Sequence, residues 1–128
     1  METKKIVITG GANRIGRSIA LELASYDTEI VIHYLKSFTA AKKLKVELEN
    51  LGSIVHLFKA DLNNLKQTQG IIPFAFKKMK GLNCLINNAS IFENDNLVNF
   101  SDKNFLKHMN INLKAPAILI KYFTKKYK

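Results

Sequence analysis

The sequence contains one cysteine and no long apolar run. The first shortage excludes an internal disulfide, and the second argues against a membrane-spanning helix. The single Cys84 cannot form an internal disulfide, which favours a reducing compartment where it is expected to be a small buried hydrophobe. The longest apolar run, residues 115–120, falls far short of the roughly 20 residues that a membrane-spanning helix needs. The apolar run near the N-terminus is too short for a signal peptide, so we expect a cytoplasmic protein without a membrane partner.

Arginine is also scarce, although the net charge is +10. Residues 65–128 contribute +8 of this charge, through eleven lysines against three acidic residues, so one alternative is a basic nucleic-acid-binding protein. The lysines are spread along expected helices without a zinc-finger, helix-turn-helix or aromatic RNA-binding motif, so we expect a solvated face and no nucleic-acid partner. The two arginines, Arg14 and Arg17, both lie in a glycine-rich segment, and guanidinium groups bind phosphate through paired hydrogen bonds.

Length and composition fit one domain of residues 1–128, with 47% hydrophobic and 23% charged residues. Hydrophobic patterning predicts strands over residues 5–9, 29–34, 53–58 and 82–86. It predicts helices over residues 14–25 and 37–51, a broken helix over 65–80 and a long helix over 101–126. This alternation indicates an α/β fold with a doubly wound parallel sheet, in which ligands bind beyond the carboxyl ends of the strands.

Two of the expected helices carry an apolar stripe. The first has Ile15, Ile19 and Leu23 at intervals of four residues. The stripe of the last helix consists of Phe105, Met109, Asn112, Pro116, Leu119 and Phe123. Asn112 is the polar member, and Pro116 has no N–H for its carbonyl, which is therefore free to hold a water. A polar residue tolerated at a proline kink is the alternative.

A glycine-rich turn, residues 9–16, joins the first expected strand to the first helix. Glycine permits a tight turn and a close approach of the backbone to a ligand, while the helix N-terminus offers free N–H groups and positive potential. A glycine pair also serves any tight strand-to-helix turn, which is the alternative. The glycine-rich turn follows the first strand in a series of alternating strands and helices, and this position favours a phosphate-binding turn.

Two segments resemble motifs of the short-chain dehydrogenase/reductase family. Thr9, Gly10 and Gly16 match its Thr-Gly-x-x-x-Gly-x-Gly motif, and residues 87–89 match the start of its Asn-Asn-Ala-Gly motif. The resemblance implies a Rossmann-type fold that binds a nicotinamide cofactor. It extends along the whole chain but covers the first half of a family member. We therefore expect a chain truncated after about four strands and the fourth helix, and a homo-oligomer for the intact protein.

Departures from these motifs make the chain similar to the pteridine reductases of the family. Arg14 replaces the middle glycine and Ser90 the last one. The end of the second strand, residues 33–36, lacks the carboxylate that an NAD-selective site uses, whereas Arg14, Arg17 and Lys36 offer positive charge to an extra phosphate. We therefore expect NADP(H) as the cofactor. The alternative is that His33 and Lys36 are merely exposed residues at a strand end.

The resemblance also implies individual contacts with the cofactor. Arg14 and Ser37 are expected to bind the 2′-phosphate, Asp61 the adenine amino group, and residues 88–89 the adjacent ribose, while Leu62 lines the adenine ring. A helix N-cap is the alternative role of Asp61. The expected cofactor residues are Gly10, Asn13, Arg14, Ile15, Gly16, His33, Tyr34, Lys36, Ser37, Asp61, Leu62, Asn88, Ala89 and Ser90.

Substrate and catalytic residues are implied in the same way. Ser90 and Phe92 are expected to contact the substrate, with the phenylalanine ring stacked on a flat pterin, although a lone phenylalanine can also be a packing residue. Asn112 is expected to be the active-site asparagine whose carbonyl holds a water of the proton relay. Tyr122 and Lys126 have the family's catalytic Tyr-x-x-x-Lys spacing, but they lie roughly 15–21 Å along the helix from Asn112, so we interpret them as a solvated helix end.

These observations favour an NADP(H)-dependent reductase that passes hydride to a small molecule, a pterin or dihydrofolate. One alternative within the family is a carbonyl reductase that acts on a 3-oxoacyl thioester. Two further alternatives lie outside this activity. One is a nucleotide-binding remnant without turnover, and the other is the basic nucleic-acid-binding protein.

Overall fold

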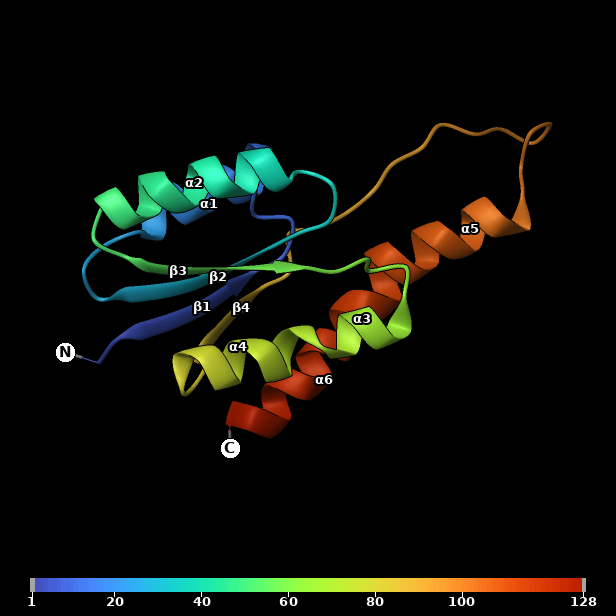
Figure 1. Cartoon of the computed structure of the whole chain (residues 1–128). Coiled ribbons are helices and arrows are strands. Elements are labelled where there is room, and N and C mark those ends of the chain that lie inside the picture. The colour runs from blue at the N-terminus through green and yellow to red at the C-terminus, as the bar shows by residue number, and fades with distance from the viewer. Residues whose placement is uncertain (1, 128) are drawn as a thin grey trace.

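The computed structural model describes residues 2–127, and its centre is a parallel sheet of four strands in the order β3-β2-β1-β4 (Figure 1). The strands are β1 (Lys4–Ile8), β2 (Thr28–Tyr34), β3 (Ile54–Lys59) and β4 (Cys84–Ile86). After β3 the chain crosses back and places β4 on the other side of β1, so the strand order reverses between β1 and β4. The predicted doubly wound parallel sheet is confirmed, and its switch point lies at the carboxyl ends of these two strands.

Helices cover both faces of the sheet (Figure 1). On one face lie α1 (Arg14–Leu23) and α2 (Phe38–Asn50), and on the other lie α3 (Leu65–Gln69), α4 (Ile71–Met79) and α6 (Ala115–Tyr127). Across residues 2–127, none of the helices combines the length and the apolarity that are needed to cross a bilayer.

The side chains of β1 alternate between two apolar cores. Ile6 and Ile8 pack in the cluster that includes Leu44 of α2, whereas Val7 packs in the cluster that includes Ile72 of α4. All five side chains are buried. Burial on both faces explains why Ile6, Val7 and Ile8 form a continuous apolar run in β1.

The segment between β3 and β4 forms two short helices, and Gly70 separates them, which confirms the predicted broken helix. The Asn64 side chain caps α3 by accepting a hydrogen bond from the Gln67 N–H at 3.0 Å. Asp61 instead accepts a hydrogen bond from the Asn63 N–H at 2.9 Å. The alternative role of Asp61 as a helix cap is therefore wrong.

The long helix predicted from Ser101 is present but contains a π turn. It runs through α5 (Asp102–Met109), the π turn η1 (Asn110–Lys114) and α6. Ser101 caps it, because its Oγ accepts a hydrogen bond from the Asn104 N–H at 3.1 Å. At the end of η1, the Ala115 N–H bonds to the carbonyl five residues earlier, so this turn holds one residue more than an α-helical turn.

The π turn changes which side of the long helix is buried. Phe105 and Met109, which were predicted to share the apolar stripe, are 46% and 39% exposed. Leu119 is buried, together with Ile111 and Ala115, which lie outside the predicted stripe. The prediction assumed one continuous helical period, and the extra residue in η1 advances that period by one position.

The stripe predicted on the first helix faces the core only in part, because Ile19 and Leu23 pack against the core cluster of Ile6 and Ile8, whereas Ile15 projects into solvent. Ile15 is 71% exposed, and Ile19 and Leu23 are half-buried. Gly16 and Ala20 are the buried residues of α1. Their small size lets the helix lie close to the sheet, and the larger side chains therefore project sideways.

Cys84 lies on the edge strand β4 and is half-buried against the core cluster that contains Ile6 and Ile8. Burial raises the pKa of its thiol, which favours the protonated form. Cys84 thus packs as a small hydrophobe, as predicted, although it is less buried than expected.

Lys80 offers a test of the local backbone geometry. It ends α4 in the left-handed conformation, with φ of 54° and ψ of 44°, which costs a residue with a Cβ about 1–2 kcal/mol. We expect Lys80→Gly to raise the free energy of unfolding by about 0.5 kcal/mol after the entropy cost of glycine, as measured by urea denaturation. Lys78→Gly, inside α4, is the control and should lower it by about 1 kcal/mol. Equal destabilisation by both substitutions would contradict the geometry.

Candidate functional site

The segments that follow all four strands converge on one cavity of about 680 Å³. Its lining comes from the glycine-rich turn after β1, residues 33–37 at and beyond the end of β2, residues 60–63 after β3 and residues 88–91 after β4. Lys107 of α5 and Ile111 of η1 complete the wall, and neither was expected from the sequence. The segments predicted to hold the cofactor are thus brought together.

Thr9 and Asn88 join the ends of β1 and β4. The Thr9 Oγ1 accepts hydrogen bonds from the N–H groups of Asn88, at 3.1 Å, and of Ala89, at 3.0 Å. In return, the Asn88 side-chain amide donates to the carbonyls of Thr9, at 3.1 Å, and of Gly10, at 3.0 Å. The Asn88 amide, predicted to bind ribose, therefore also holds the two walls of the cavity together.

Two glycines allow these walls to meet. Gly10 has a φ of +61°, and a Cβ there would lie 2.9 Å from the Ala89 Cα. A Cβ on Gly16 would lie 2.3 Å from the Gly10 carbonyl oxygen and 2.6 Å from the Asn88 Nδ2. Gly16 is not among the residues that line the cavity, and its predicted contact with the cofactor would be made by its backbone N–H, while the missing side chain allows α1 to start against the turn.

The N-terminus of α1 points its free N–H groups at the cavity wall without a side-chain cap. Asn13 occupies the cap position but makes no capping hydrogen bond among the described residues. Its side chain donates instead to the Ser37 Oγ at 2.7 Å. The first helical hydrogen bond runs from the Arg17 N–H to the Asn13 carbonyl, so the N–H groups of residues 14–16 face an anion site by the geometry of a helix start.

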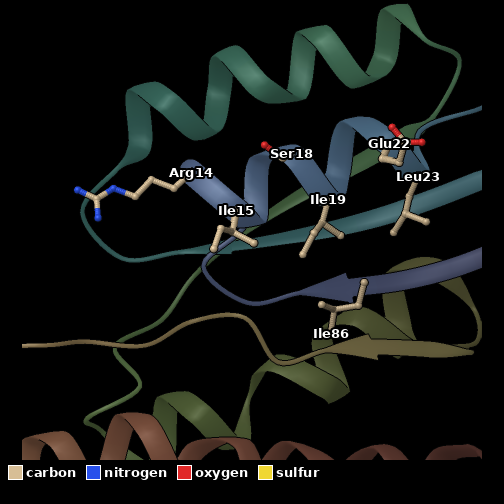
Figure 2. Close-up of a pocket in the computed structure, with 7 residues that line it drawn as sticks. All are labelled: Arg14, Ile15, Ser18, Ile19, Glu22, Leu23 and Ile86. Atoms are coloured by element: carbon tan, nitrogen blue, oxygen red, sulfur yellow. The ribbon is translucent and has the colours of Figure 1, made fainter.

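Positive side chains accompany these N–H groups. Arg14 lines the cavity and extends from the start of α1 toward the segment that enters α2 (Figure 2). Lys36 and Ser37 also line the cavity on that segment. Arg17, considered from the sequence as a further phosphate ligand, instead pairs with Glu47 of α2 at 2.5 Å.

His33 is part of the cavity wall, but it is not the exposed residue that the alternative described. It lines the cavity but is only 3% exposed, so it is not a solvated strand end. Its Nδ1 accepts a hydrogen bond from the Gly10 N–H at 3.0 Å, and its Nε2 donates to the Ala60 carbonyl at 2.8 Å. Burial lowers the pKa of His33 and favours the neutral ring. With both nitrogens occupied by backbone groups, His33 has no N–H left for a phosphate.

The wall after β3 is partly apolar. Leu62 is 7% exposed, and Asp61 is half-buried. The Asp61 N–H donates to the Gln67 Oε1 at 2.7 Å, and the Asn63 Oδ1 accepts from the Asn110 Nδ2 at 3.1 Å. These hydrogen bonds fix the segment to α3 and η1. The Asp61 carboxylate and the apolar Leu62 side chain are adjacent in this segment, and such a pair is suited to binding a flat polar ring.

Asn112 fastens the segment after β4 to the long helix. It is exposed, contrary to the buried position expected from the stripe. Its Oδ1 accepts a hydrogen bond from the Ile91 N–H and its Nδ2 donates to the Ile91 carbonyl, both at 2.9 Å. Pro116 lies four residues later and cannot donate to the Asn112 carbonyl. The predicted catalytic role of that carbonyl remains a prediction.

Phe92 lies between two residues that are hydrogen-bonded to the long helix, Ile91 before it and Glu93 after it. Beyond it, the Glu93 N–H donates to the His108 Nε2 at 3.0 Å, and Lys107 pairs with the Glu93 carboxylate at 2.7 Å. The hydrogen bond from Lys107 holds the pKa of Glu93 below its usual range. The Phe92 ring is 84% exposed, so the packing alternative is wrong and the ring is available for contact.

Tyr122 and Lys126 lie outside this cavity. Tyr122 packs against the core cluster on the α4 and α6 side of the sheet, and the Lys126 Nζ lies 4.8 Å from the centre of the Phe76 ring. Neither is among the described residues that line the cavity. Their placement supports the interpretation that they are not a catalytic pair, but the predicted solvated helix end is wrong for Tyr122, which is half-buried.

A second cavity, of about 780 Å³, runs beside α1. Figure 2 shows Ile15, Ile19 and Leu23 of α1 pointing toward it, with Ile86 of β4 opposite. Its lining is mainly apolar, whereas the first cavity gathers amides, hydroxyls and charges from four strand ends. The first cavity is therefore the better candidate for a polar ligand.

Comparison with known proteins agrees with this geometry. The model of the family described as short chain dehydrogenase matches residues 4–128. The 3-oxoacyl-[acyl-carrier-protein] reductase FabG of Buchnera aphidicola is 32% identical over 114 residues, which are 88% of this chain and 45% of the relative.

Two solved structures are similar over nearly the whole chain. A short chain dehydrogenase from Burkholderia cenocepacia in complex with NADP has a TM-score of 0.93 at 26% identity, covering 98% of this chain and 51% of that one. FolM alternative dihydrofolate reductase 1 from Brucella canis, complexed with NADP, has a TM-score of 0.87 at 28% identity, covering 96% of this chain and 50% of that one. The chain thus spans about half the length of the proteins it matches.

Proposed function

The chain belongs to the short chain dehydrogenase family, and from this we propose that its polar cavity binds NADP(H) in an oxidoreductase of small molecules. When bound, the nicotinamide of such a cofactor supplies or accepts a hydride. The observation that carries the proposal is the uncapped N-terminus of α1 beside Arg14, because it combines free N–H groups with a guanidinium at a strand switch point. Similar structures that hold NADP support it.

The preference for NADP(H) over NAD(H) rests on charge. Arg14, Lys36 and Ser37 line the cavity, and Glu93, an acid in the same lining, is paired with Lys107. A 2′-phosphate there would gain charge-assisted hydrogen bonds that a 2′-hydroxyl cannot. The remaining contacts are proposed from Gly10, Asn13, Ile15, Gly16, His33, Tyr34, Asp61, Leu62, Asn88, Ala89 and Ser90.

For the substrate we propose a pterin or dihydrofolate. Ser90 lines the cavity, and the exposed ring of Phe92 beside it offers a flat surface for stacking. The similarity to the Brucella dihydrofolate reductase supports this class. Asn112, bonded to Ile91 in the same segment, would hold a water of the proton relay on its carbonyl. A homo-oligomer is proposed for the whole protein.

A 3-oxoacyl thioester is the second candidate substrate, because the Buchnera FabG relative is 32% identical to the chain. The two candidates differ in what they need from Phe92, since a pterin stacks on the ring and an acyl chain does not. Dihydrofolate binding that disappears in Phe92→Ala would support the pterin, and acetoacetyl thioester binding that survives this substitution would support the thioester.

Calorimetric titration of the chain with NADP⁺ and NAD⁺ tests the cofactor. We expect NADP⁺ to bind at least tenfold more tightly, because one charge-assisted hydrogen bond contributes about 1.5–3 kcal/mol. Equal affinities would contradict the NADP preference. No binding of either dinucleotide at millimolar concentration would overturn the proposed function.

A further inference from the structure

The His33 ring contacts the glycine-rich turn through Nδ1 and the segment after β3 through Nε2. A carbonyl oxygen can only accept a hydrogen bond, so the contact with Ala60 requires the proton on Nε2. The Nδ1 is then a free acceptor, as the hydrogen bond from the Gly10 N–H requires. One neutral tautomer therefore satisfies both contacts, and a protonated ring would place two donors face to face at Gly10.

The backbone of His33 acts on the same turn. Its carbonyl accepts a hydrogen bond from the Gly11 N–H at 3.2 Å, so both N–H groups of the glycine pair are directed at one residue. These two N–H groups are thus already hydrogen-bonded within the protein. The N–H groups of residues 14–16, at the start of α1, are then the ones that remain free to bind a ligand.

We propose that His33 is a positioning residue for the cofactor: its imidazole connects the turn after β1 to the segment after β3, and this connection sets the affinity for NADP(H). This inference rests on the proposed function. Gly10 has no side chain to anchor it and adopts a φ of +61°, so hydrogen bonds fix its orientation. Without the Nδ1 acceptor, the Gly10 N–H loses its partner, and the turn shifts relative to the N–H groups of α1.

Two substitutions separate the two ring contacts. In His33→Asn, the side-chain oxygen replaces Nδ1 and keeps an acceptor for the Gly10 N–H, whereas in His33→Gln the side-chain amide replaces Nε2 and keeps the donor to Ala60. We expect His33→Asn to retain NADP⁺ affinity within about threefold and His33→Gln to weaken it about tenfold, as loss of one hydrogen bond implies. His56→Gln is the control, because His56 lies on β3, bonds to Glu29 and does not line the cavity.

The pH dependence of NADP⁺ binding distinguishes positioning from a structural role alone. Because burial lowers the pKa of His33, protonation competes with its contact to Gly10 only below about pH 6.5, so the unsubstituted chain should lose several-fold more affinity than His33→Asn as the pH falls from 6.5 to 4.5. The 2′-phosphate titrates in the same range, but it does so with both proteins, so their difference reports on His33. The other titratable or charged groups around the cavity, likewise present in both, are Arg14, Tyr34, Lys36, Asp61, Glu93, Lys107 and the adjacent His108.

Hydrogen exchange of the Gly10 amide gives a readout without any ligand. His33→Gln should speed this exchange and His33→Asn should leave it slow. Unchanged NADP⁺ affinity in His33→Gln, or identical pH profiles for the unsubstituted chain and His33→Asn, would overturn the inference even though NADP⁺ binds. A chain that binds no NADP⁺ would overturn the proposed function and the affinity effect, and amide exchange would still decide whether His33 holds the turn.

Discussion

Replacing Gly16 by alanine is expected to abolish measurable NADP⁺ binding and to lower the free energy of unfolding by about 3 kcal/mol. The added Cβ would lie 2.3 Å from the Gly10 carbonyl oxygen and 2.8 Å from the Gly11 Cα. Both are backbone atoms, which cannot move aside as a flexible side chain can. Either α1 or the glycine-rich turn must shift, and the anion site lies between them. Calorimetry measures the affinity, and urea denaturation measures the stability.

Gly70→Ala is the matched control. Gly70 has a φ of −81°, and its Cβ would meet the Gln67 carbonyl oxygen at 3.4 Å, an ordinary contact. We expect NADP⁺ affinity to stay unchanged and the free energy of unfolding to rise by about 0.5 kcal/mol, because alanine restricts the unfolded chain. A Gly16→Ala protein as stable as this control would contradict the close approach of α1 to the turn.

Arg14→Gly is expected to stabilise the fold while it weakens the cofactor site. Arg14 adopts a φ of 50°, a left-handed conformation that costs about 1–2 kcal/mol for a residue with a Cβ. Glycine removes this cost but adds about 0.5–1 kcal/mol of chain entropy, so the free energy of unfolding should rise by about 0.5 kcal/mol. Loss of the guanidinium should weaken NADP⁺ binding 10- to 100-fold, as measured by calorimetry.

Arg14→Ala separates the two effects, because it removes the guanidinium and keeps the backbone cost. Its NADP⁺ affinity should fall as far as that of Arg14→Gly, whereas its stability should not rise. NAD⁺, which lacks the 2′-phosphate, should bind both variants within about threefold of the unsubstituted chain. Full retention of NADP⁺ affinity in either variant would show that Arg14 is not a phosphate ligand.

The strands and the cavity segments could be predicted because they depend on local patterns. The buried part of a parallel strand such as β1 is a continuous apolar run, here residues 6–8, and ligand sites follow the carboxyl ends of such strands. The faces of the helices could not be predicted as well. In α1 the apolar Ile15 is exposed because the small residues Gly16 and Ala20 pack on the sheet, and periodicity alone gives them little weight.

The roles of individual site residues depend on contacts between distant segments. His33 lies near the end of β2, and its sequence neighbours do not reveal that Gly10 and Ala60 will lie on either side of its ring. Lys107 reaches the cavity wall because the π turn and the irregular segment after β4 place α5 there. No local spacing in the sequence predicts that approach.

The hydrogen bonds between Thr9 and Asn88 also bear on the order in which the chain folds. They join residues 79 positions apart, and contacts of such separation require a long loop to close before they form. The unit of β1, α1 and β2 depends on nearer contacts and can assemble first. The coenzyme pocket therefore becomes complete only when β4 docks beside β1, and a dinucleotide that binds it would draw the folding equilibrium toward the finished chain.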